Sequence, residues 1–437
     1  MNTVKIHINR LGAVRDSEVE LKPLMIFSGE SGLGKSYVAI LVHYVYKLLS
    51  ENRLQNFFLA NGWDVDTLTV TSPQNGTFTV QSSQLLQWIN EDACHYMRDS
   101  VGNPELPVDV SIQLPITQLL YTFTYRTVLI GMEGKEESNV VFELNGDLNL
   151  RVEGNVKSLG GMPWAILLQN SLNREIFGAT NIDQTFCMVP GRGALLNIPY
   201  TAQDRLKNSK DNKDNKDIYS EFLSDWDIVR TMDPHKERDT DLVARLYDIN
   251  GGQIEIDEDE KVIYRLTDGK PMPINAAASS IKELAPLYVL LDKYPSSRLS
   301  VLFEEPEAHL HPQKQVSIAD FVVSAIGHGM HLQITTHSDY FLRRINDRIF
   351  LGKIRDLSEP TYKSTIEKYR YTDLTITSSV IGAYLLRRVG ADEVKVIPQS
   401  LEKGIPYESF YDVIRKDSRH SLDIQQTYYK LIEKDAE

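Results

Sequence analysis

The chain opens with a change in the pattern of apolar and polar residues. The two kinds alternate over residues 4–8 and 17–21, and this alternation predicts two half-buried antiparallel strands. Residues 24–28 are apolar up to a final serine and predict a buried strand. A glycine-rich stretch then leads into a helix predicted over residues 35–49. The first part of the chain is therefore a small sheet followed by a strand–loop–helix unit.

Further elements are predicted where apolar periodicity alternates with turn residues. The expected helices cover residues 84–99, 163–177, a segment that Ser279 or Ser280 caps and that ends near residue 291, a segment near 383–389, and 422–434. The expected strands cover residues 120–130, 139–152, 185–189, 299–304, 331–336 and 376–380, with a hairpin of 252–256 and 261–266. The acidic tip of that hairpin, residues 257–260, is interpreted as a solvated turn and not as a metal site.

The same pattern divides the chain into segments. We predict a core domain from residues 1–50, 119–206 and 245–375, a helical insertion at 51–118, a flexible polar excursion at 207–217, and a C-terminal α/β extension at 376–437. The excursion has no apolar residue and therefore nothing to bury.

The final predicted helix carries an apolar stripe. It is formed by Leu422, Ile424, Tyr428, Leu431 and Ile432. Because an apolar face on a helix is normally covered, we expect the stripe to pack against the chain itself. Docking of a partner is the alternative.

Composition places the chain among ordinary globular proteins. Of its 437 residues, 42% are hydrophobic and 24% are charged, which allows two or three domains or one large domain with insertions. The net charge of −13 argues against a protein that coats DNA, although a local basic groove would still permit DNA contact. Cys94 and Cys187 form no CxxC, so a disulfide scaffold is not expected. With no signal-peptide pattern and no apolar run near the roughly 20 residues that span a bilayer, we expect a cytoplasmic protein without a membrane partner.

The most specific motif is the glycine-rich stretch. It reads Gly29, Glu30, Ser31, Gly32, Leu33, Gly34, Lys35 and Ser36, which matches G-x-x-x-x-G-K-[ST]. The glycines let successive backbone N–H groups point at phosphate oxygens, and the positive end of the following helix adds to that field. Lys35 is expected to reach the β- and γ-phosphates, and Ser36 to bind Mg²⁺. The motif therefore predicts a site for ATP and Mg²⁺.

A pair of carboxylates ends the predicted strand 299–304. Glu304 and Glu305 stand where hydrolysis of a phosphoanhydride needs acids, opposite a phosphate loop. Glu304 is expected to hold Mg²⁺ through its water shell, and Glu305 to orient and polarise the attacking water. The pair therefore predicts an ATPase.

His337 ends the next predicted strand, residues 331–336. A neutral imidazole at that place is able to donate to the γ-phosphate or to position the water. We favour this catalytic role over that of an ordinary surface histidine because the strand follows the acid pair.

Other residues at strand ends receive weaker interpretations. Arg192, beyond the strand 185–189, is interpreted as a surface arginine, with a phosphate contact as the alternative. Two histidine pairs match no zinc spacing and are not expected to bind a metal: His309 with His311, and His328 with His331.

Together these motifs resemble the ABC-type ATPases of the overcoming-lysogenisation-defect and RecF-like group. The resemblance rests on the phosphate loop, the acid-tipped strand, Glu-Pro-Glu-Ala-His-Leu-His-Pro at 305–312 and Thr-Thr-His-Ser at 335–338. It covers residues 1–50 and about 250–350 well, and the middle poorly. The fold it implies is α/β: a P-loop NTPase with an ABC-type ATPase head, a mixed sheet, an antiparallel β-subdomain and helical insertions.

The resemblance also implies a signature motif. In that group Ser-Ser-Gly-Ile-Lys precedes a helix and contacts the γ-phosphate bound by the opposite subunit. The matching residues are Ala-Ser-Ser-Ile-Lys at 278–282, in which Ser279 keeps the serine and Ser280 replaces the glycine. Ser279 is therefore expected to bind nucleotide across a dimer.

Three more roles follow from the resemblance. Glu305 keeps the catalytic position, His337 corresponds to the switch histidine, and residues 310–312 fall in a loop that crosses the dimer interface. Glu304 replaces the usual aspartate on the Mg²⁺ side, and with Ser280 this change predicts slow or regulated hydrolysis. The lid-loop glutamine has no clear counterpart; its candidates are Gln113, Gln118 and Gln184.

The implied assembly is a head-to-tail dimer, or a higher homo-oligomer, that buries two ATP molecules between subunits. Our first hypothesis is a switch or sensor of bacterial anti-phage defence that controls a separately encoded effector, a nuclease or a toxin. The alternative is a RecF- or SMC-like DNA-repair or chromosome-maintenance ATPase, which the lack of sustained heptads weakens. A nuclease within the chain is not expected, because no Asp-x-Asp follows His337. A small-molecule kinase is disfavoured by the late position of the acid pair.

Overall fold

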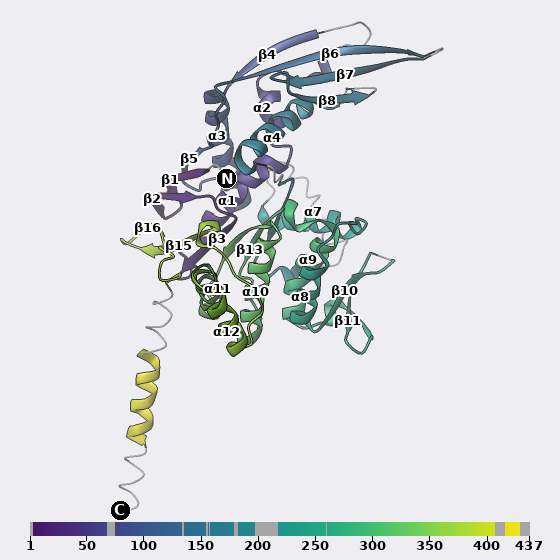
Figure 1. The fold of residues 1–437 in the computed structure, drawn as a ribbon. Coiled ribbons are helices and arrows are strands. Elements are labelled where there is room, and N and C mark those ends of the chain that lie inside the picture. The colour runs from purple at the N-terminus through teal and green to yellow at the C-terminus, as the bar shows by residue number, and fades with distance from the viewer. Residues whose placement is uncertain are drawn as a thin grey trace, which may run out of the picture.

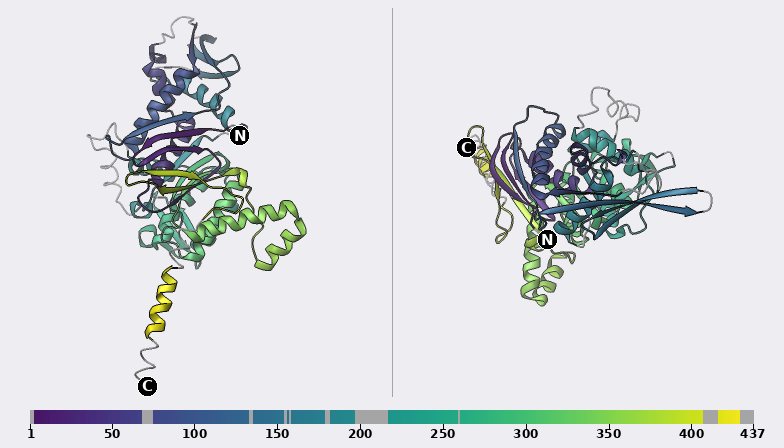
Figure 2. Two further views of the ribbon diagram at one scale, coloured as in Figure 1. Left: turned by 90° about the vertical axis from the view of Figure 1, so that its left-hand side faces the viewer. Right: turned by 90° about the horizontal axis from the view of Figure 1, so that it is seen from above.

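The computed structural model describes most of the chain. The described residues are 3–67, 75–132, 135–153, 156, 158–178, 182–196, 217–258, 260–406 and 416–428. Figure 1 shows a central sheet, a second sheet with long strands at one end, and a small third sheet beside helices α8 and α9. Figure 2 shows α11 and α12 protruding from one side.

The centre of the fold is a nine-stranded mixed sheet. Its strands are β1 (Lys5–Leu11), β2 (Val14–Glu20), β3 (Leu24–Gly29), β5 (Val108–Gln113), β9 (Gln184–Met188), β13 (Leu299–Glu304), β14 (His331–Thr335), β15 (Ile381–Arg388) and β16 (Val394–Pro398). They lie in the order β5-β1-β2-β16-β15-β3-β14-β13-β9. The five strands from β15 to β9 are parallel, whereas β1 is antiparallel to β2 and β5. The predicted α/β class with a mixed sheet is confirmed.

Burial explains why the two halves of this sheet differ. Strands β3, β13 and β14 are buried at every position, as parallel strands covered on both faces are. Strand β2 has exposed and partly buried positions between the buried Val14 and Val19. The predicted strands 4–8, 17–21, 24–28, 299–304 and 331–336 all have counterparts within a few residues.

Helices cover the parallel half of the sheet. In Figure 1, α1 (Lys35–Ser50) lies above the central strands, and α10 (Pro312–Gly327) and α11 (Asp339–Leu357) lie below them. Further helices among the described residues are α2 (Leu54–Ala60), α3 (Ser82–Ser100), α4 (Met162–Phe177), α5 (Arg192–Leu195), α7 (Ile218–Thr231), α8 (Thr240–Asn250), α9 (Ser279–Lys293) and α12 (Glu359–Tyr369). The predicted helices 35–49, 84–99 and 163–177 are confirmed as α1, α3 and α4.

A four-stranded antiparallel sheet projects from the core (Figure 1). It has the order β4-β6-β7-β8 and consists of β4 (Asn75–Gln81), β6 (Leu120–Met132), β7 (Lys135–Leu144) and β8 (Leu148–Glu153). Helix α4 packs against it, and Phe123 and Trp164 meet with ring centroids 5.9 Å apart. A turn that contains Asn145 and Gly146 divides the single strand predicted at 139–152 into β7 and β8.

Residues 51–118, predicted to be a helical insertion, contain two strands as well as helices. Strand β4 pairs with β6, and β5 pairs with β1 in the central sheet. The segment therefore belongs to both sheets and is not a separate helical unit. The apolar–polar alternation of β4 is short and follows turn residues, so the sequence did not predict a strand there. Its partner β6 lies far along the chain.

The third sheet contains the predicted hairpin. It consists of β10 (Gly252–Ile256), β11 (Val262–Leu266) and β12 (Pro271–Pro273). Asp257, Glu258 and Glu260 are exposed in the turn between β10 and β11, which agrees with a solvated tip.

The segment after residue 375 differs from its prediction. The helix expected near 383–389 is strand β15, and the strand expected at 376–380 is absent: residues 376 and 377 are irregular and are followed by the 3₁₀ turn η5 (Ser378–Val380). Strand β15 pairs with the distant β3 on one side and with β16, the next strand along the chain, on the other, and these hydrogen bonds override its local helical preference. The boundary predicted at residue 375 therefore cuts through the central sheet.

The last described residues, 416–428, form a helix that overlaps the predicted helix 422–434. Leu422, Ile424 and Tyr428 are 56%, 70% and 60% exposed, so the expected packing of these three residues is wrong within this chain. Leu431 and Ile432 lie outside the described residues, as does the predicted excursion apart from Asp217.

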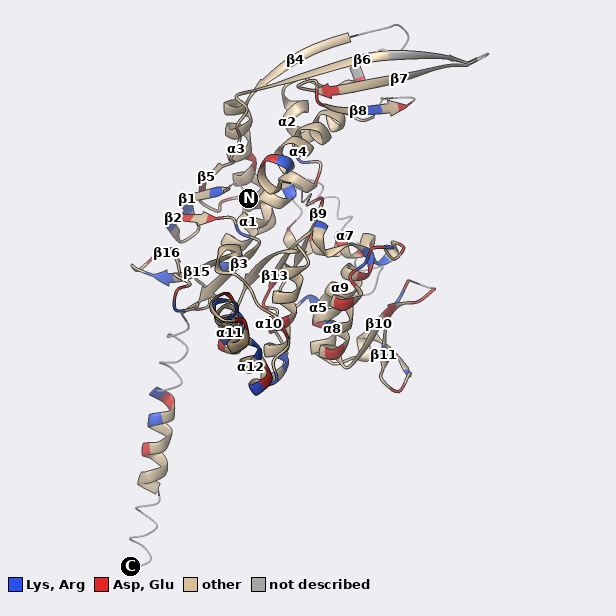
Figure 3. Ribbon diagram, viewed as in Figure 1, with Lys and Arg blue, Asp and Glu red and all other residues tan. Residues whose placement is uncertain are grey.

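Charge is mixed over the surface of the described residues. Figure 3 shows lysines and arginines next to aspartates and glutamates on the same helices, for example on α11 and α12. Within the described part of the chain, no helix has both the length and the apolar character that crossing a membrane requires.

Candidate nucleotide-binding site

The phosphate loop joins β3 to α1 and is shaped by left-handed glycines. Gly32 and Gly34 have φ values of 74° and 90°, and Gly34 is the N-cap of α1. Gly29 has φ 126°, and a Cβ atom there would lie 2.4 Å from the carbonyl oxygen of Leu386 in β15. Gly29 is thus required by a neighbouring strand as well as by the curl of the loop.

Lys35 folds back over the loop. Its Nζ donates to the carbonyl oxygens of Gly29 at 3.0 Å and Glu30 at 2.8 Å. Burial lowers the pKa of this ammonium to about 8, against the opposing effect of Glu305 and other carboxylates. An ammonium has three donors, so one donor is left for a phosphate oxygen.

Ser36 contacts Glu304 directly. The serine hydroxyl donates to Oε2 of Glu304, a side chain that is only 2% exposed. Burial raises the pKa of Glu304 to about 7, with the charge of Glu305 adding to the shift and the hydrogen bond from Ser36 opposing it. A hydroxyl and a carboxylate are oxygen ligands of the kind that Mg²⁺ prefers, so these two residues fit the predicted metal.

The peptide that joins Glu304 to Glu305 is held at both ends. Its carbonyl oxygen accepts from Nη1 of Arg192 at 2.8 Å, and its N–H donates to the carbonyl oxygen of Thr335 at 3.0 Å. Glu305 has a left-handed φ of 44°, and its side chain is 43% exposed. The bend turns the second carboxylate out of the buried strand and toward solvent.

His337 faces Glu305 from the next strand. Its Nε2 lies 4.0 Å from Oε1 of Glu305, and its backbone N–H donates to Oε1 of Glu307 at 2.6 Å. Burial and the charge of Lys35 lower the pKa of His337, while Glu305 opposes the shift. This lowered pKa favours the neutral imidazole, the form that its expected role requires.

These elements enclose a cavity of about 410 Å³. Its lining is Leu11, Ala13, Ser31, Gly32, Leu33, Gly34, Lys35, Ser36, Tyr37, Glu305, Thr335 and His337. The fold thus brings the loop, Glu305 and His337 to one place, with Glu304 behind Ser36. Gly29 and Glu30 take part through the carbonyl oxygens that hold Lys35.

Ser279 lies elsewhere. It is exposed at the first position of α9 and is not among the residues that line the cavity. The glutamine candidates Gln113, Gln118 and Gln184 do not line it either. The structure therefore leaves the lid-loop glutamine unassigned.

Arg192 was interpreted as a surface arginine, and the structure shows that this is wrong. It is 0% exposed and is one of the largest fully buried side chains among the described residues. Its place beyond a buried strand was a signal for burial. Two of its acceptors, the carbonyl oxygens of Glu304 and Glu283, lie far from it along the chain, and only that of Val189 is local.

Glu307 is a further residue to which the sequence assigned no role. It belongs to the recognised Glu-Pro-Glu segment, and only the structure shows that it accepts from Thr336 and His337. Tyr37 and the β1–β2 turn line the cavity without belonging to any motif.

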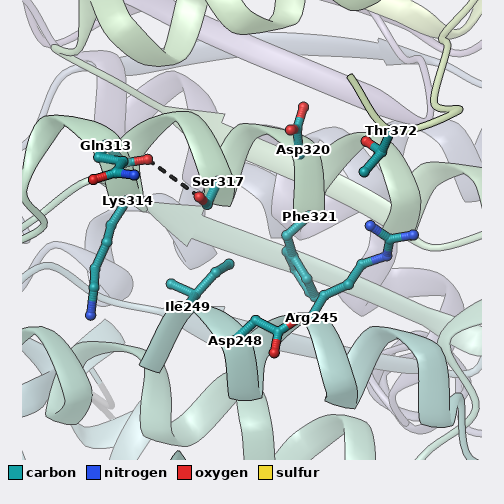
Figure 4. A pocket seen from close by; sticks show the side chains of 9 residues that line it. All are labelled: Arg245, Asp248, Ile249, Gln313, Lys314, Ser317, Asp320, Phe321 and Thr372. Carbon is teal, nitrogen blue, oxygen red and sulfur yellow. Dashed lines mark hydrogen bonds between the residues drawn. The ribbon is translucent and has the colours of Figure 1, made fainter. Parts of the chain in front are cut away.

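A second cavity, of about 390 Å³, lies between α8 and α10. Figure 4 shows Arg245 and Asp248 on the α8 side of this cavity and Lys314 and Ser317 on the α10 side, with the carboxylate of Asp320 turned away from α8. Both carboxylate oxygens of Asp320 accept from arginines of α11, so this acid is already satisfied within the protein.

One protein family matches the part of the chain that carries the acid pair. Residues 147–343, which include Glu304, Glu305 and His337, match the protein family described as "AAA domain, putative AbiEii toxin, Type IV TA system". No curated protein matches the chain.

Among solved structures, the chain is similar to three heads of SMC proteins. One is an SmcHead bound to the C-winged helix domain of ScpA (10% identity, 92% of this chain and 98% of that chain covered, TM-score 0.36). Another is the SMC head domain from Thermotoga maritima (9%, 92% and 100%, TM-score 0.34). A third is the Smc head domain with an extended coiled coil bound to the C-terminal domain of ScpA, from Pyrococcus furiosus (12%, 95% and 99%, TM-score 0.36). The AAA match and the geometry of the loop support a P-loop NTPase fold.

Proposed function

We propose that the chain binds ATP with Mg²⁺, assembles with a second copy around the nucleotide, and hydrolyses ATP slowly as the timer of a switch. Lys35 and the loop N–H groups hold the phosphates, and Ser36 with Glu304 holds the metal, which neutralises charge on the phosphates. Glu305 orients and polarises the attacking water, and His337 is the neutral donor beside it.

The position of Ser279 carries the two-copy part of this proposal. Ser279 opens α9 at an exposed helix N-terminus, where backbone N–H groups favour an anion. It does not line the cavity of its own chain. A second copy placed head to tail brings this serine to the γ-phosphate of the facing site, and that contact is the one the resemblance implies.

The output of the switch is proposed to be a separately encoded effector, a nuclease or a toxin, in bacterial anti-phage defence. Support for a role in such a system comes from the matched family, whose description includes the words "putative AbiEii toxin, Type IV TA system". The place of action is proposed to be the cytoplasm.

The RecF- or SMC-like alternative is less favoured. The longest helices among the described elements, α3 and α11, have 19 residues each. The described part of the segment between the two halves of the site forms sheets and short helices, and no long helical arm.

The decisive experiment measures the native mass of the Glu305→Gln protein, expressed with its neighbouring genes, with ATP, with ADP and without nucleotide. Glu305→Gln keeps the shape of the side chain but removes the carboxylate that polarises water, so bound ATP persists. We expect a dimer or larger assembly with ATP but not with ADP or without nucleotide. A polypeptide that co-purifies with this assembly identifies the effector.

Two controls complete this experiment. Lys35→Met should abolish the ATP-dependent assembly, and Ser279→Arg should abolish assembly while leaving ATP binding intact. A Glu305→Gln protein that binds ATP and stays monomeric contradicts the two-copy site. Assembly that requires DNA favours the repair ATPase instead.

A further inference from the structure

Arg192 is a buried cation directly behind the two acids. It opens α5 and is 0% exposed, and its guanidinium lies 4.8 Å from the ring centroid of Phe303. A buried charge destabilises a protein unless hydrogen bonds and counter-charges compensate it. The partners of Arg192 therefore indicate what it is used for.

One part of the guanidinium holds the backbone at the acids. Nη1 donates to the carbonyl oxygens of Glu304 at 2.8 Å and Val189 at 3.1 Å. The first of these oxygens belongs to the peptide whose N–H Thr335 holds from the opposite side. A displacement of Arg192 would rotate that peptide and change the direction of the Glu305 side chain.

Another part of the guanidinium holds helix α9. Nε donates to the carbonyl oxygen of Glu283 at 2.7 Å and lies 3.5 Å from Oε2 of the same residue. Glu283 is 3% exposed and stands about one helical turn beyond Ser279. Its Oε1 lies 4.0 Å from Nε2 of His309, in the loop that follows the acids.

The close approach of α5 to α9 depends on a glycine. A Cβ atom at Gly193 would lie 2.9 Å from Oε1 of Glu283 and 3.0 Å from its backbone nitrogen. Both distances are shorter than ordinary contacts, so an alanine there would push the two helices apart.

We propose that Arg192 is a positioning residue that connects α9 to the Glu304–Glu305 peptide, so that the seating of Ser279 on a second copy's nucleotide sets the direction of the catalytic carboxylate. The inference rests on the function proposed above and deepens it. Nucleotide binding by a single chain needs only the loop, whereas hydrolysis also needs α9 in place. The assembled state thereby becomes the state that hydrolyses.

Arg192→Lys is the direct test, because lysine keeps the charge and loses the planar fork that reaches two elements at once. ATP hydrolysis is measured at protein concentrations that saturate assembly. We expect kcat to fall by about 10-fold or more, as for a misdirected catalytic group, while KM and the affinity for a fluorescent ATP analogue change by less than about three-fold. Assembly of Arg192→Lys in the Glu305→Gln background is expected to remain.

Arg348→Lys is the matched control. Arg348 is also 0% exposed and also binds a carboxylate and backbone carbonyl oxygens, in this case those of Asp320, Thr372 and Leu374. None of these residues lines the nucleotide cavity. Arg348→Lys should lower the melting temperature and leave kcat of the folded fraction unchanged.

Two milder variants keep the test decisive if Arg192→Lys does not fold. Glu283→Gln removes the carboxylate charge and keeps the backbone acceptor, and Gly193→Ala separates α5 from α9 with Arg192 intact. Each should lower kcat by about three-fold or more at unchanged nucleotide affinity. The inference is overturned if a folded Arg192→Lys, or both milder variants, keeps kcat within about two-fold of the parent, or loses affinity in step with kcat.

Hydrogen exchange separates this inference from the proposed function. In the nucleotide-free chain, Arg192→Lys should raise exchange together in residues 279–286 and 304–308, because one side chain holds both segments. Unchanged exchange in either segment overturns the inference even if the parent hydrolyses ATP. A parent that neither assembles nor hydrolyses refutes the proposed function, and with it the catalytic consequence drawn here for Arg192.

Discussion

One carboxylate oxygen of Glu307 accepts the backbone N–H of His337 at 2.6 Å. The same oxygen accepts the hydroxyl of Thr336 at 2.8 Å, and the side chain is almost fully buried. Burial raises the pKa of Glu307, and the hydrogen bond from the N–H of His337 opposes that shift. The loop that carries the histidine is therefore fixed by an acid of the Glu-Pro-Glu segment.

Glu307→Ala is expected to lose both stability and turnover. Two buried donors lose their acceptor, which destabilises the fold by about 1–3 kcal/mol, and His337 is no longer directed at the cavity. Glu307→Gln keeps one oxygen acceptor and should retain most of both properties. Thermal melting and phosphate release measure the two effects. The exposed acid Glu359 supplies the control, Glu359→Ala, and a Glu307→Ala protein that matches this control contradicts the assignment.

Gly29→Ala and Gly32→Ala should differ sharply although both glycines have positive φ. At Gly29 the added Cβ atom meets the backbone of Leu386 at 2.4 Å, whereas at Gly32 nothing lies within 4 Å. We expect Gly29→Ala to destabilise the protein by about 3 kcal/mol or more, and Gly32→Ala by about 1 kcal/mol from backbone strain alone. Urea unfolding measures both, and equal losses would show that β15 does not constrain the loop.

Glu304→Gln is expected to stabilise the nucleotide-free protein at high pH. The carboxyl has an ordinary pKa of 4.5 in the unfolded chain, and burial raises it to about 7 in the fold. It therefore destabilises the fold increasingly as the pH rises from 4.5 to 7, by about 3 kcal/mol in full. Urea unfolding should show this gain for Glu304→Gln at pH 8 and little gain at pH 4.5. The same gain at both pH values refutes the shift.

His331 should lower the stability of the fold as the pH falls, which is opposite to the effect of Glu304. It is buried beneath α1 with its Nδ1 2.9 Å from the hydroxyl of Tyr46, and burial lowers its pKa from 6.5 to about 4. The fold favours the neutral form of His331. The free energy of unfolding is therefore unaffected by its titration above pH 6.5 and decreases as the pH falls toward 4. Between pH 7 and pH 5 the loss is about 2 kcal/mol. His331→Gln should lack that part of the pH dependence of stability. If the free energies of unfolding of the two proteins change with pH in parallel, the assignment to His331 is wrong.

The sequence by itself determined the parts of this protein whose physics is local. The strand, the glycines, Lys35 and Ser36 follow one another within a few residues, and period and residue type predicted their geometry. The sequence also predicted the positions of Glu304, Glu305 and His337, because each stands at the end of an apolar strand.

The tertiary structure decided what depends on partners far along the chain. Strand β15 has a helical local sequence and becomes a strand because β3, near the start of the chain, supplies hydrogen bonds along one edge, with the neighbouring β16 on the other. Arg192 looked like a surface arginine, and it is buried because α9 and β13 offer backbone acceptors that the local sequence does not contain. Gly29 matched a phosphate motif, yet its tightest requirement comes from Leu386. A sequence pattern records the local preference of a residue, whereas its hydrogen-bond and packing partners exist only once the strands and helices have come together.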